Sequence, residues 1–135
     1  MKVEARPVAG PDPMTEPWWN ATREGRLLIQ RCAECGHHQH YPRPVCTSCH
    51  SASVSFVEAF GKGTVYSFSV SHRSPHPAFE PPYVVALVRL EEGPVLLTNI
   101  VGCPPEEVAC DIKVHLHWEE LPDGRKLPLF TPEGT

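Results

Sequence analysis

Apolar and polar residues alternate along several parts of the chain, which is the pattern of half-buried β-strands. The clearest case is residues 63–73, GTVYSFSVSHR, in which Tyr66, Phe68 and Val70 share one face. Residues 83–90, YVVALVRL, form an almost continuous β-branched run, which is typical of a buried strand. The segments predicted as strands are 26–32, 53–60, 63–73, 83–90, 95–102, 112–121 and, as a final edge segment, 126–132.

The segments between these strands carry turn residues, and one short helix precedes them. Thr15 can cap that helix, Pro17 suits its first turn, and Gly25 can end it. Residues 74–82, SPHPAFEPP, form a proline-rich loop, and residues 103–111, CPPEEVACD, form a loop or a single helical turn. Short strands at regular spacing predict a small barrel or sandwich.

Composition also favours a fold of short strands, and it disfavours nucleic acid as a partner. Sixteen prolines in 135 residues exceed the usual share of about 5%. Because proline fixes φ and removes a hydrogen-bond donor, long helices and central strands are disfavoured. The net charge of −4 and the lack of a strongly basic patch make nucleic acid an unfavourable partner. No apolar run is long enough to cross a membrane and no signal-peptide layout is visible, which predicts a cytoplasmic protein.

Residues 31–50, RCAECGHHQHYPRPVCTSCH, contain two Cys-x-x-Cys pairs with ten residues between them. Two such turns facing each other form a tetrahedral site of four sulfurs, which suits zinc. The four predicted ligands are Cys32, Cys35, Cys46 and Cys49. They leave no position for water or substrate, so the predicted metal is structural. Iron in the same ligands is the alternative, whereas two disulfides would need an oxidising compartment.

Four histidines lie beside the two cysteine pairs: His37, His38, His40 and His50. They are interpreted as polar surface, with a Cys₃His site using one of them as the alternative. Cys103 and Cys110 are interpreted as free, partly buried thiols. The sequence has no glycine-rich phosphate loop, no Gly-x-Ser-x-Gly and no His-Glu-x-x-His motif. The chain alone is therefore not predicted to be an enzyme.

The order of these segments resembles a known family of small proteins that join a rubredoxin-like zinc ribbon to an OB-fold and occur beside thiolases and related acyl-CoA enzymes. A Trp-containing helix is followed by LLIQRCAECGHHQHYPRPVCTSCHS, GKGTVYSFSVSHR, PPYVVALVRLEEGPVLLTNIVG and CDIKVHLHWEELPDGRKLPLFTP. The resemblance covers about residues 15–132. It implies a mainly β fold in which a short N-terminal helix and a zinc ribbon, residues 15–53, precede a small OB-fold barrel, residues 54–132. Residues 1–14, rich in proline and poor in apolar residues, are predicted to be a flexible arm.

Individual positions also match the family pattern. The four cysteines match its metal ligands, and Arg43 matches the arginine of its Pro-Arg-x-x-Cys segment. Gly61, Gly63 and Thr64 match the Gly-x-Gly-Thr start of its first barrel strand. Asp111 is a departure, because the family commonly has glycine there, and this predicts a changed turn.

The resemblance implies a non-catalytic accessory subunit of a hetero-oligomer that binds acyl-CoA, stabilises a thiolase-fold partner, or does both. The partner would be a thiolase, a lipid-transfer-type aldolase of steroid or lipid degradation, or a hydratase. A CoA binder needs cations for the phosphates, and the candidates are Arg43, Lys62, His72 and Arg73. Trp18 and Phe79 are candidate anchors at the partner interface, whereas Trp19 and Tyr83 are interpreted as core.

Two other functions remain open at this point. Zinc ribbons and OB-folds also bind single-stranded nucleic acids, with Tyr66 and Phe68 as the stacking residues. These two side chains share a face with Val70 that resembles core, and the acidic balance also argues against this function. A rubredoxin-like electron carrier is the third possibility and requires iron.

Overall fold

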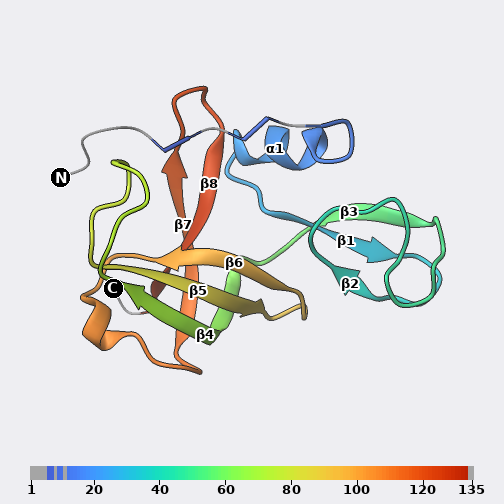
Figure 1. Cartoon of the computed structure of the whole chain (residues 1–135). Helices are drawn as coiled ribbons and strands as arrows, with labels where there is room; N and C mark the ends of the chain where they lie inside the picture. Colours follow the sequence, from blue (N-terminus) through green and yellow to red (C-terminus); the bar gives the residue numbers. More distant parts are fainter. Residues whose placement is uncertain (1–5, 8, 11, 134–135) are drawn as a thin grey trace.

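The structure is a computed structural model that describes residues 6, 7, 9, 10 and 12–133. A three-stranded sheet lies beside a five-stranded barrel, and one helix lies next to both (Figure 1). The elements in chain order are α1 (Glu16–Thr22), β1 (Leu28–Cys32), β2 (His38–Gln39), β3 (Val54–Glu58), β4 (Lys62–Ser71), β5 (Tyr83–Leu90), β6 (Val95–Ile100), the 3₁₀ turn η1 (Pro105–Glu107), β7 (Lys113–Glu120) and β8 (Lys126–Pro132). The mainly β prediction is confirmed.

The small sheet has the strand order β2-β1-β3 and is antiparallel throughout. β1 pairs along its whole length with β3, from Leu28 opposite Glu58 to Cys32 opposite Val54. Residues 54–58 therefore belong to the ribbon sheet, and the barrel strands begin at Lys62, eight residues after the expected boundary between residues 53 and 54.

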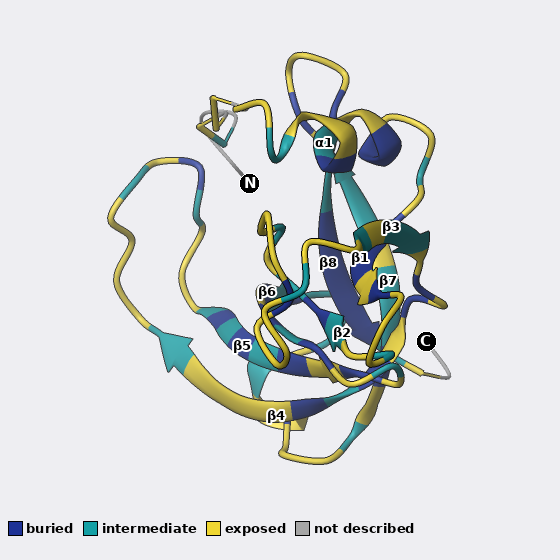
Figure 2. Ribbon diagram, turned by 90° about the vertical axis from the view of Figure 1, so that its right-hand side faces the viewer, coloured by how far each residue is buried: buried dark blue, intermediate teal, exposed yellow. Residues whose placement is uncertain are grey.

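The barrel is closed in the order β4-β5-β6-β8-β7. β8 was expected at an edge, but it lies between two strands: it pairs with β7 along its length and with β6 at Ile100–Phe130. A β-bulge between Val65 and Ser67 interrupts the pairing of β4 with β5. In Figure 2, β8 is mostly buried while much of β4 beyond the bulge is exposed.

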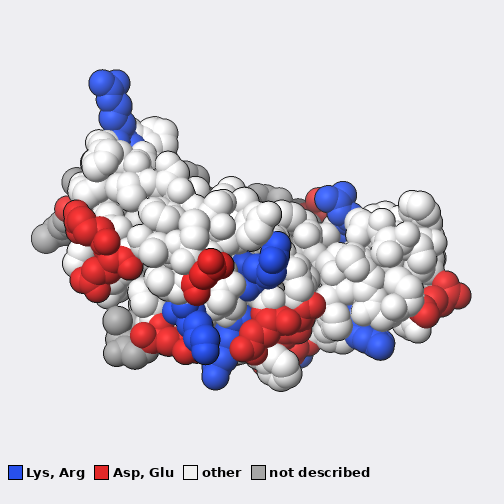
Figure 3. Space-filling model, turned by 90° about the horizontal axis from the view of Figure 1, so that it is seen from below, with Lys and Arg blue, Asp and Glu red and all other residues white. Residues whose placement is uncertain are grey.

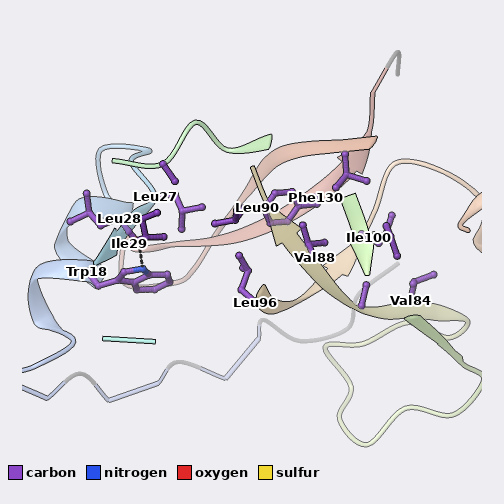
Figure 4. Close-up of a cluster of buried hydrophobic side chains, with 14 of the residues drawn as sticks. Trp18, Leu27, Leu28, Ile29, Val84, Val88, Leu90, Leu96, Ile100 and Phe130 are labelled. Carbon is purple, nitrogen blue, oxygen red and sulfur yellow. Dashed lines mark hydrogen bonds between the residues drawn. The ribbon is translucent and has the colours of Figure 1, made fainter. Parts of the chain in front are cut away.

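The ribbon and the barrel share one hydrophobic core (Figure 4). Leu27 and Ile29 from the ribbon side belong to the same buried cluster as Leu90 and Phe130 of the barrel. Trp18 of α1 joins this cluster, and its indole Nε1–H donates to the carbonyl of Leu28 at 2.9 Å. Because buried apolar surface is the main favourable term in folding, the two parts stabilise each other.

The helix ends largely as the sequence predicts. Gly25 adopts a φ of 71° after the last turn, and its N–H donates to Thr22 O at 3.0 Å. Thr15 occupies the N-cap position but makes no side-chain capping bond. The carboxylate of Asp12 instead accepts hydrogen bonds from the backbone N–H groups of Met14 and Thr15, both at 2.9 Å.

The described part of the N-terminal arm lies against the barrel. The guanidinium of Arg6 pairs with Glu119, donates to Asn99 Oδ1 at 3.0 Å and lies 4.8 Å from the ring centroid of Phe79. The flexibility expected for residues 1–14 stays a prediction, because residues 1–5, 8 and 11 lie outside the described residues. Among the helices of the described ranges, none is long and apolar enough to cross a membrane.

Candidate metal centre and seam groove

The two Cys-x-x-Cys turns bring four sulfurs to one point. The Sγ atoms of Cys32, Cys35, Cys46 and Cys49 all lie within 4.8 Å of one another. Cys32 to Cys49 and Cys35 to Cys46 are both 3.6 Å, which is too long for a disulfide. Zinc–sulfur bonds of about 2.3 Å in a tetrahedron place the sulfurs about 3.8 Å apart. The residues therefore fit a tetrahedral metal ion.

Backbone N–H groups point at the sulfurs and favour their ionised form. The N–H groups of Ser48 and Cys49 donate to Cys46 Sγ at 3.3 and 3.5 Å. A hydrogen bond from the backbone N–H of Cys35 is the main reason that the pKa of Cys32 falls to about 7. The backbone N–H of Ser51 acts in the same direction on Cys49, but burial and the three other thiols together raise the pKa of Cys49 to about 12. The four thiols can therefore all be ionised together only when a cation lies among them.

Two buried glutamines hold the loop between the cysteine pairs, and sequence reasoning missed both. Gln30 Oε1 accepts from the backbone N–H of Arg43 at 2.8 Å, and Gln30 Nε2 donates to the carbonyl of Arg43 at 2.9 Å. Gln39 Nε2 donates to Gln30 Oε1 at 2.8 Å, and Gln39 Oε1 accepts from the N–H of Thr47 at 2.9 Å. A polar glutamine at an inward-facing position of a strand beside the Cys-x-x-Cys turns is the sequence feature that could have indicated this role.

The histidines beside the cysteine pairs differ in how far they are buried. His37 and His50 are exposed, as expected for polar surface. His40 is half-buried, with its ring 5.7 Å from Trp18 and 4.1 Å from Tyr41, and this burial lowers its pKa to about 4. His40 is therefore a neutral packing residue between the ribbon and α1.

A groove of about 500 Å³ opens where β6 and β8 diverge, and we call it the seam groove. Helix α1, the ribbon loop, the 74–82 loop and both diverging strands contribute to it. Its lining includes Trp18, Trp19, Tyr41, Phe79, Leu97 and Pro128. Sequence reasoning did not predict this groove, because its walls come from segments that are far apart in the chain.

The two expected interface anchors both line the seam groove, but they differ in exposure. Trp18 is only 7% exposed and belongs to the core, so it is a core residue and not the surface anchor that the sequence favoured. Trp19, expected in the core, is the more exposed of the pair, and the guanidinium of Arg125 lies 4.6 Å from its ring centroid. Phe79 is half-buried and stacks on Tyr83 at 5.4 Å.

The four residues predicted to bind CoA are exposed, but they lie in different parts of the fold. Arg43 lies in the ribbon loop, Lys62 begins β4, and His72 and Arg73 follow the end of that ten-residue strand. Lys62 instead lines a cavity of about 370 Å³ together with Arg89 and Lys113. Glu91 and Glu133 line it too, and Figure 3 shows basic and acidic side chains close together on one face of the molecule.

Tyr66 and Phe68 are not core residues. They are 53% and 36% exposed, and the guanidinium of Arg89 lies 4.5 Å from the Tyr66 ring centroid. The β-bulge between Val65 and Ser67 breaks the alternation, so that Phe68 pairs with buried Ala86 whereas Tyr66 lies on the other face beside Arg89. Burial in the core therefore does not exclude nucleic-acid stacking by Tyr66, whereas the net charge of −4 still disfavours it.

Two family models match consecutive parts of the chain. Residues 19–55 match "ChsH2, rubredoxin-like zinc ribbon domain", and residues 56–119 match "ChsH2, C-terminal OB-fold domain". Among solved structures, "Ltp2-ChsH2(DUF35) aldolase" aligns with a TM-score of 0.83 and 46% identity, covering 94% of this chain and 98% of that one.

The curated relatives differ in length, and the first two are much longer than this chain. The probable enoyl-CoA hydratase alpha subunit of Thermomonospora curvata is 49% identical over 115 residues, which are 85% of this chain and 36% of the relative. The 3-oxo-4,17-pregnadiene-20-carboxyl-CoA hydratase alpha subunit of Mycobacterium tuberculosis is 35% identical, covering 84% of this chain and 39% of the relative. A DUF35 domain-containing scaffold protein of Pyrococcus furiosus is 37% identical, covering 73% of this chain and 74% of the relative. The chain thus spans well under half the length of the first two relatives.

Proposed function

The chain belongs to the DUF35 family, with a zinc ribbon and OB-fold of the ChsH2 type, and we propose that it is a non-catalytic accessory subunit of a thiolase-fold enzyme. The observation that carries the proposal is the 46% identical match to an aldolase named for two components, which covers nearly the full length of both chains. The partner is then a lipid-transfer-type aldolase or a thiolase that acts on acyl-CoA compounds. The named hydratase and scaffold relatives support a place in a multi-subunit assembly.

The proposed metal is zinc, and its role is structural. Four thiolates close the coordination sphere, so neither water nor substrate gains access to the ion. A bound zinc would hold the two Cys-x-x-Cys turns together and so fix the loop that carries Tyr41 and Arg43. Metal analysis of the purified protein tests the assignment: zinc near one equivalent in colourless protein is expected, whereas red protein with iron and a reversible potential would indicate the electron carrier.

Acyl-CoA binding is the finer part of the proposal. Exposed Arg43 and the Lys62 cavity each offer cations for phosphate groups, at separate places on the molecule. Titration of the chain with coenzyme A, with and without Arg43→Gln or Lys62→Gln, tests which place contributes. We expect one variant to weaken binding severalfold and to reduce its salt dependence.

Recovery of the partner tests the accessory role. An affinity-tagged chain, expressed at its natural level in the cells that produce it, should co-purify with a thiolase-fold enzyme in a fixed ratio. The activity of that enzyme is expected to fall when this chain is removed and to return when it is added back. Isolation of the chain alone, with no thiolase-fold enzyme in stoichiometric amount, would refute the proposal.

Single-stranded nucleic acid is a second candidate ligand, because exposed Tyr66 beside Arg89 is a suitable stacking surface. The net charge of −4 and the mixed charges around this strand oppose binding. Fluorescence anisotropy with labelled oligonucleotides at low salt separates the two functions. We expect no saturable binding at micromolar protein, and tight, salt-sensitive binding lost in Tyr66→Ala would favour the second candidate.

A further inference from the structure

The outer edge of β4 is paired for only part of its length. β7 pairs with it at Lys62–Thr64, and Val65 O then accepts the backbone N–H of Asp111 at 2.8 Å. Beyond Val65, no strand of the described residues pairs with this side of β4, although β5 continues along the other side as far as Ser71. Residues 66–71, which we call the open edge of β4, therefore present backbone N–H and C=O groups that a further strand can use.

The open edge lacks the features that keep edge strands from pairing. Its sequence, YSFSVS, contains no charged residue and no proline, which are the residues that usually block such pairing. The four residues 66–69 are exposed in succession, so neither face of the strand is fully covered here. Figure 2 shows this part of β4 as exposed, beside buried and half-buried residues of β5. An uncharged strand that is open on both faces and along one edge is typical of a protein interface.

The order of side chains on the open edge is nearly symmetric about Ser69. Small hydroxyl residues stand two positions away on either side, at Ser67 and Ser71, and apolar Phe68 and Val70 stand between them. A two-fold interface brings the same surface of two copies into contact, so it requires a surface that complements itself. In an antiparallel pair centred on Ser69, that serine lies opposite its own copy and Ser67 lies opposite Ser71. Phe68 then lies opposite Val70, so small and apolar side chains each meet their own kind.

The charges at the two ends of the open edge favour the same arrangement. Exposed Arg73 follows one end, and exposed Asp111 lies at the other end, where its N–H bonds to Val65. Pairing centred on Ser69 places Arg73 of the second copy opposite Val65 and hence beside Asp111. The two-fold axis repeats this contact between opposite charges, which favours a second copy over an unrelated strand.

We propose that two copies of this chain associate by pairing the open edge of β4 antiparallel, about a two-fold axis at Ser69. β4 ends on the side of the barrel away from the ribbon, so the metal centre lies outside this interface (Figure 1). Pairing of about six residues from each copy covers less surface than a standard protein interface, which predicts a weak, reversible dimer. The inference goes beyond the accessory role and does not depend on it.

Sedimentation of the purified chain measures this self-association. Between about 5 and 500 µM protein, we expect the mean mass to rise from that of a monomer toward that of a dimer, with a dissociation constant of roughly 10–100 µM. A mean mass that stays at the monomer value, or that rises beyond the dimer, would overturn the proposal.

Opposite charges at position 69 test the two-fold axis itself. Ser69→Lys and Ser69→Glu each place like charges opposite each other in the dimer, so each variant alone should weaken association about tenfold or more. An equal mixture of the two variants places lysine opposite glutamate and should restore the dimer to within about threefold of the natural affinity. Ser69 is exposed, so neither change enters the core, and circular dichroism with metal analysis verifies the fold of both.

Two further variants locate the contact. Ser55→Lys is the matched control, because Ser55 is an exposed serine of strand β3 in the ribbon, and we expect it to leave the affinity unchanged. Arg73→Glu places a second negative charge beside Asp111 and should weaken the dimer severalfold. Equal loss in Ser55→Lys, no recovery in the mixed sample, or unchanged affinity in Arg73→Glu would each refute the pairing centred on Ser69.

The result is separable from recovery of a thiolase-fold enzyme. If such an enzyme co-purifies and protects the amides of residues 66–71 from hydrogen exchange while the chain alone stays monomeric, the open edge belongs to that enzyme and the second-copy proposal is wrong. If the chain dimerises through β4 but no such enzyme is recovered, the accessory role is wrong and the dimer stands.

Discussion

At the scale of the residue, His40 and Asp111 show how one side chain or one backbone angle departs from the simplest interpretation of the sequence. His40 lies next to exposed histidines but packs between rings, where it stays neutral. Asp111 adopts a φ of 71°, a conformation that glycine favours and that aspartate tolerates better than most residues. The glycine-to-aspartate departure therefore leaves the backbone in a glycine-type turn, and its N–H donates to Val65 O at 2.8 Å.

His40 predicts a pH dependence of stability. Burial lowers its pKa from 6.5 to about 4 in the folded chain, so between these values the unfolded chain binds the proton more readily. Stability is then full above about pH 6.5 and is lost as the pH falls toward 4, by up to about 3 kcal/mol. We expect His40→Phe, which keeps a ring against Trp18, to flatten this dependence.

The measurement is the free energy of unfolding by urea at pH 7.0 and 5.5 for both proteins, with metal content checked at each pH because acid also displaces metal from thiolates. His40→Gln serves as a second variant if phenylalanine packs poorly. Equal slopes against pH in the natural protein and both variants would show that His40 does not control the acid sensitivity.

At the scale of the element, β4 shows what an alternating pattern can and cannot predict. The pattern predicts a strand over residues 63–73, and the observed strand β4 runs from Lys62 to Ser71. It fails to show that Tyr66 and Phe68 lie on different faces, because the bulge between Val65 and Ser67 leaves no period in the sequence. In the same way, the composition of residues 126–132 indicates a strand but does not reveal that this strand lies between β6 and β7 instead of at an edge.

Gly63 predicts a large effect of a single methyl group on β4 and β5. A Cβ atom there would lie 2.3 Å from the carbonyl oxygen of Arg89, which belongs to the paired strand and cannot move freely. Gly63→Ala is expected to destabilise the protein by about 1–3 kcal/mol or to shift the pairing of the two strands. Gly10→Ala is the matched control, since nothing lies within 4 Å of its added Cβ.

Thermal melting and urea unfolding measure this difference directly. Equal stability of the two alanine variants would contradict the close approach of the strands at Gly63. The close approach also gives a physical reason for the second glycine of the Gly-x-Gly-Thr segment, while Gly61 adopts a φ of 78° and lies against Leu116.

At the scale of the whole molecule, the sequence predicts the ribbon and the barrel better than it predicts how the two pack against each other. The cysteine spacing predicts which four thiols meet at one point, since local turns are enough to bring them together. The shared core of Leu27, Ile29 and Phe130 depends on how the ribbon docks on the barrel, and no local pattern records that docking. Trp18 was misplaced for the same reason: its burial is decided by β1 and the ribbon loop, not by its position on a short helix.

Removal of the metal tests whether the shared core couples the stability of the ribbon to that of the barrel. Cys46 is fully buried, and Cys46→Ser is expected to lose the metal, unfold the ribbon and lower the melting temperature of the barrel as well. Cys110→Ser is the control, because Cys110 is exposed and lies outside the cluster. Metal content, circular dichroism and hydrogen exchange of β5 and β6 amides are the measurements.

If chelation or Cys46→Ser unfolded the ribbon while the barrel amides kept full protection from exchange, the shared core would not couple the two parts. We expect instead one cooperative transition in the metal-loaded protein and, without metal, a single transition of the barrel at a lower temperature.

If a metal binds the four thiols as proposed, the shared core couples the stability of the barrel to the supply of that metal. A newly made chain without metal would leave Leu27 and Leu28 off the barrel, and the apolar end of the barrel would stay uncovered. Chaperones and proteases act on chains with such exposed surfaces. Cells short of the metal would therefore lose this protein by turnover, and the amount of any assembly built with it would follow the metal content of the cell.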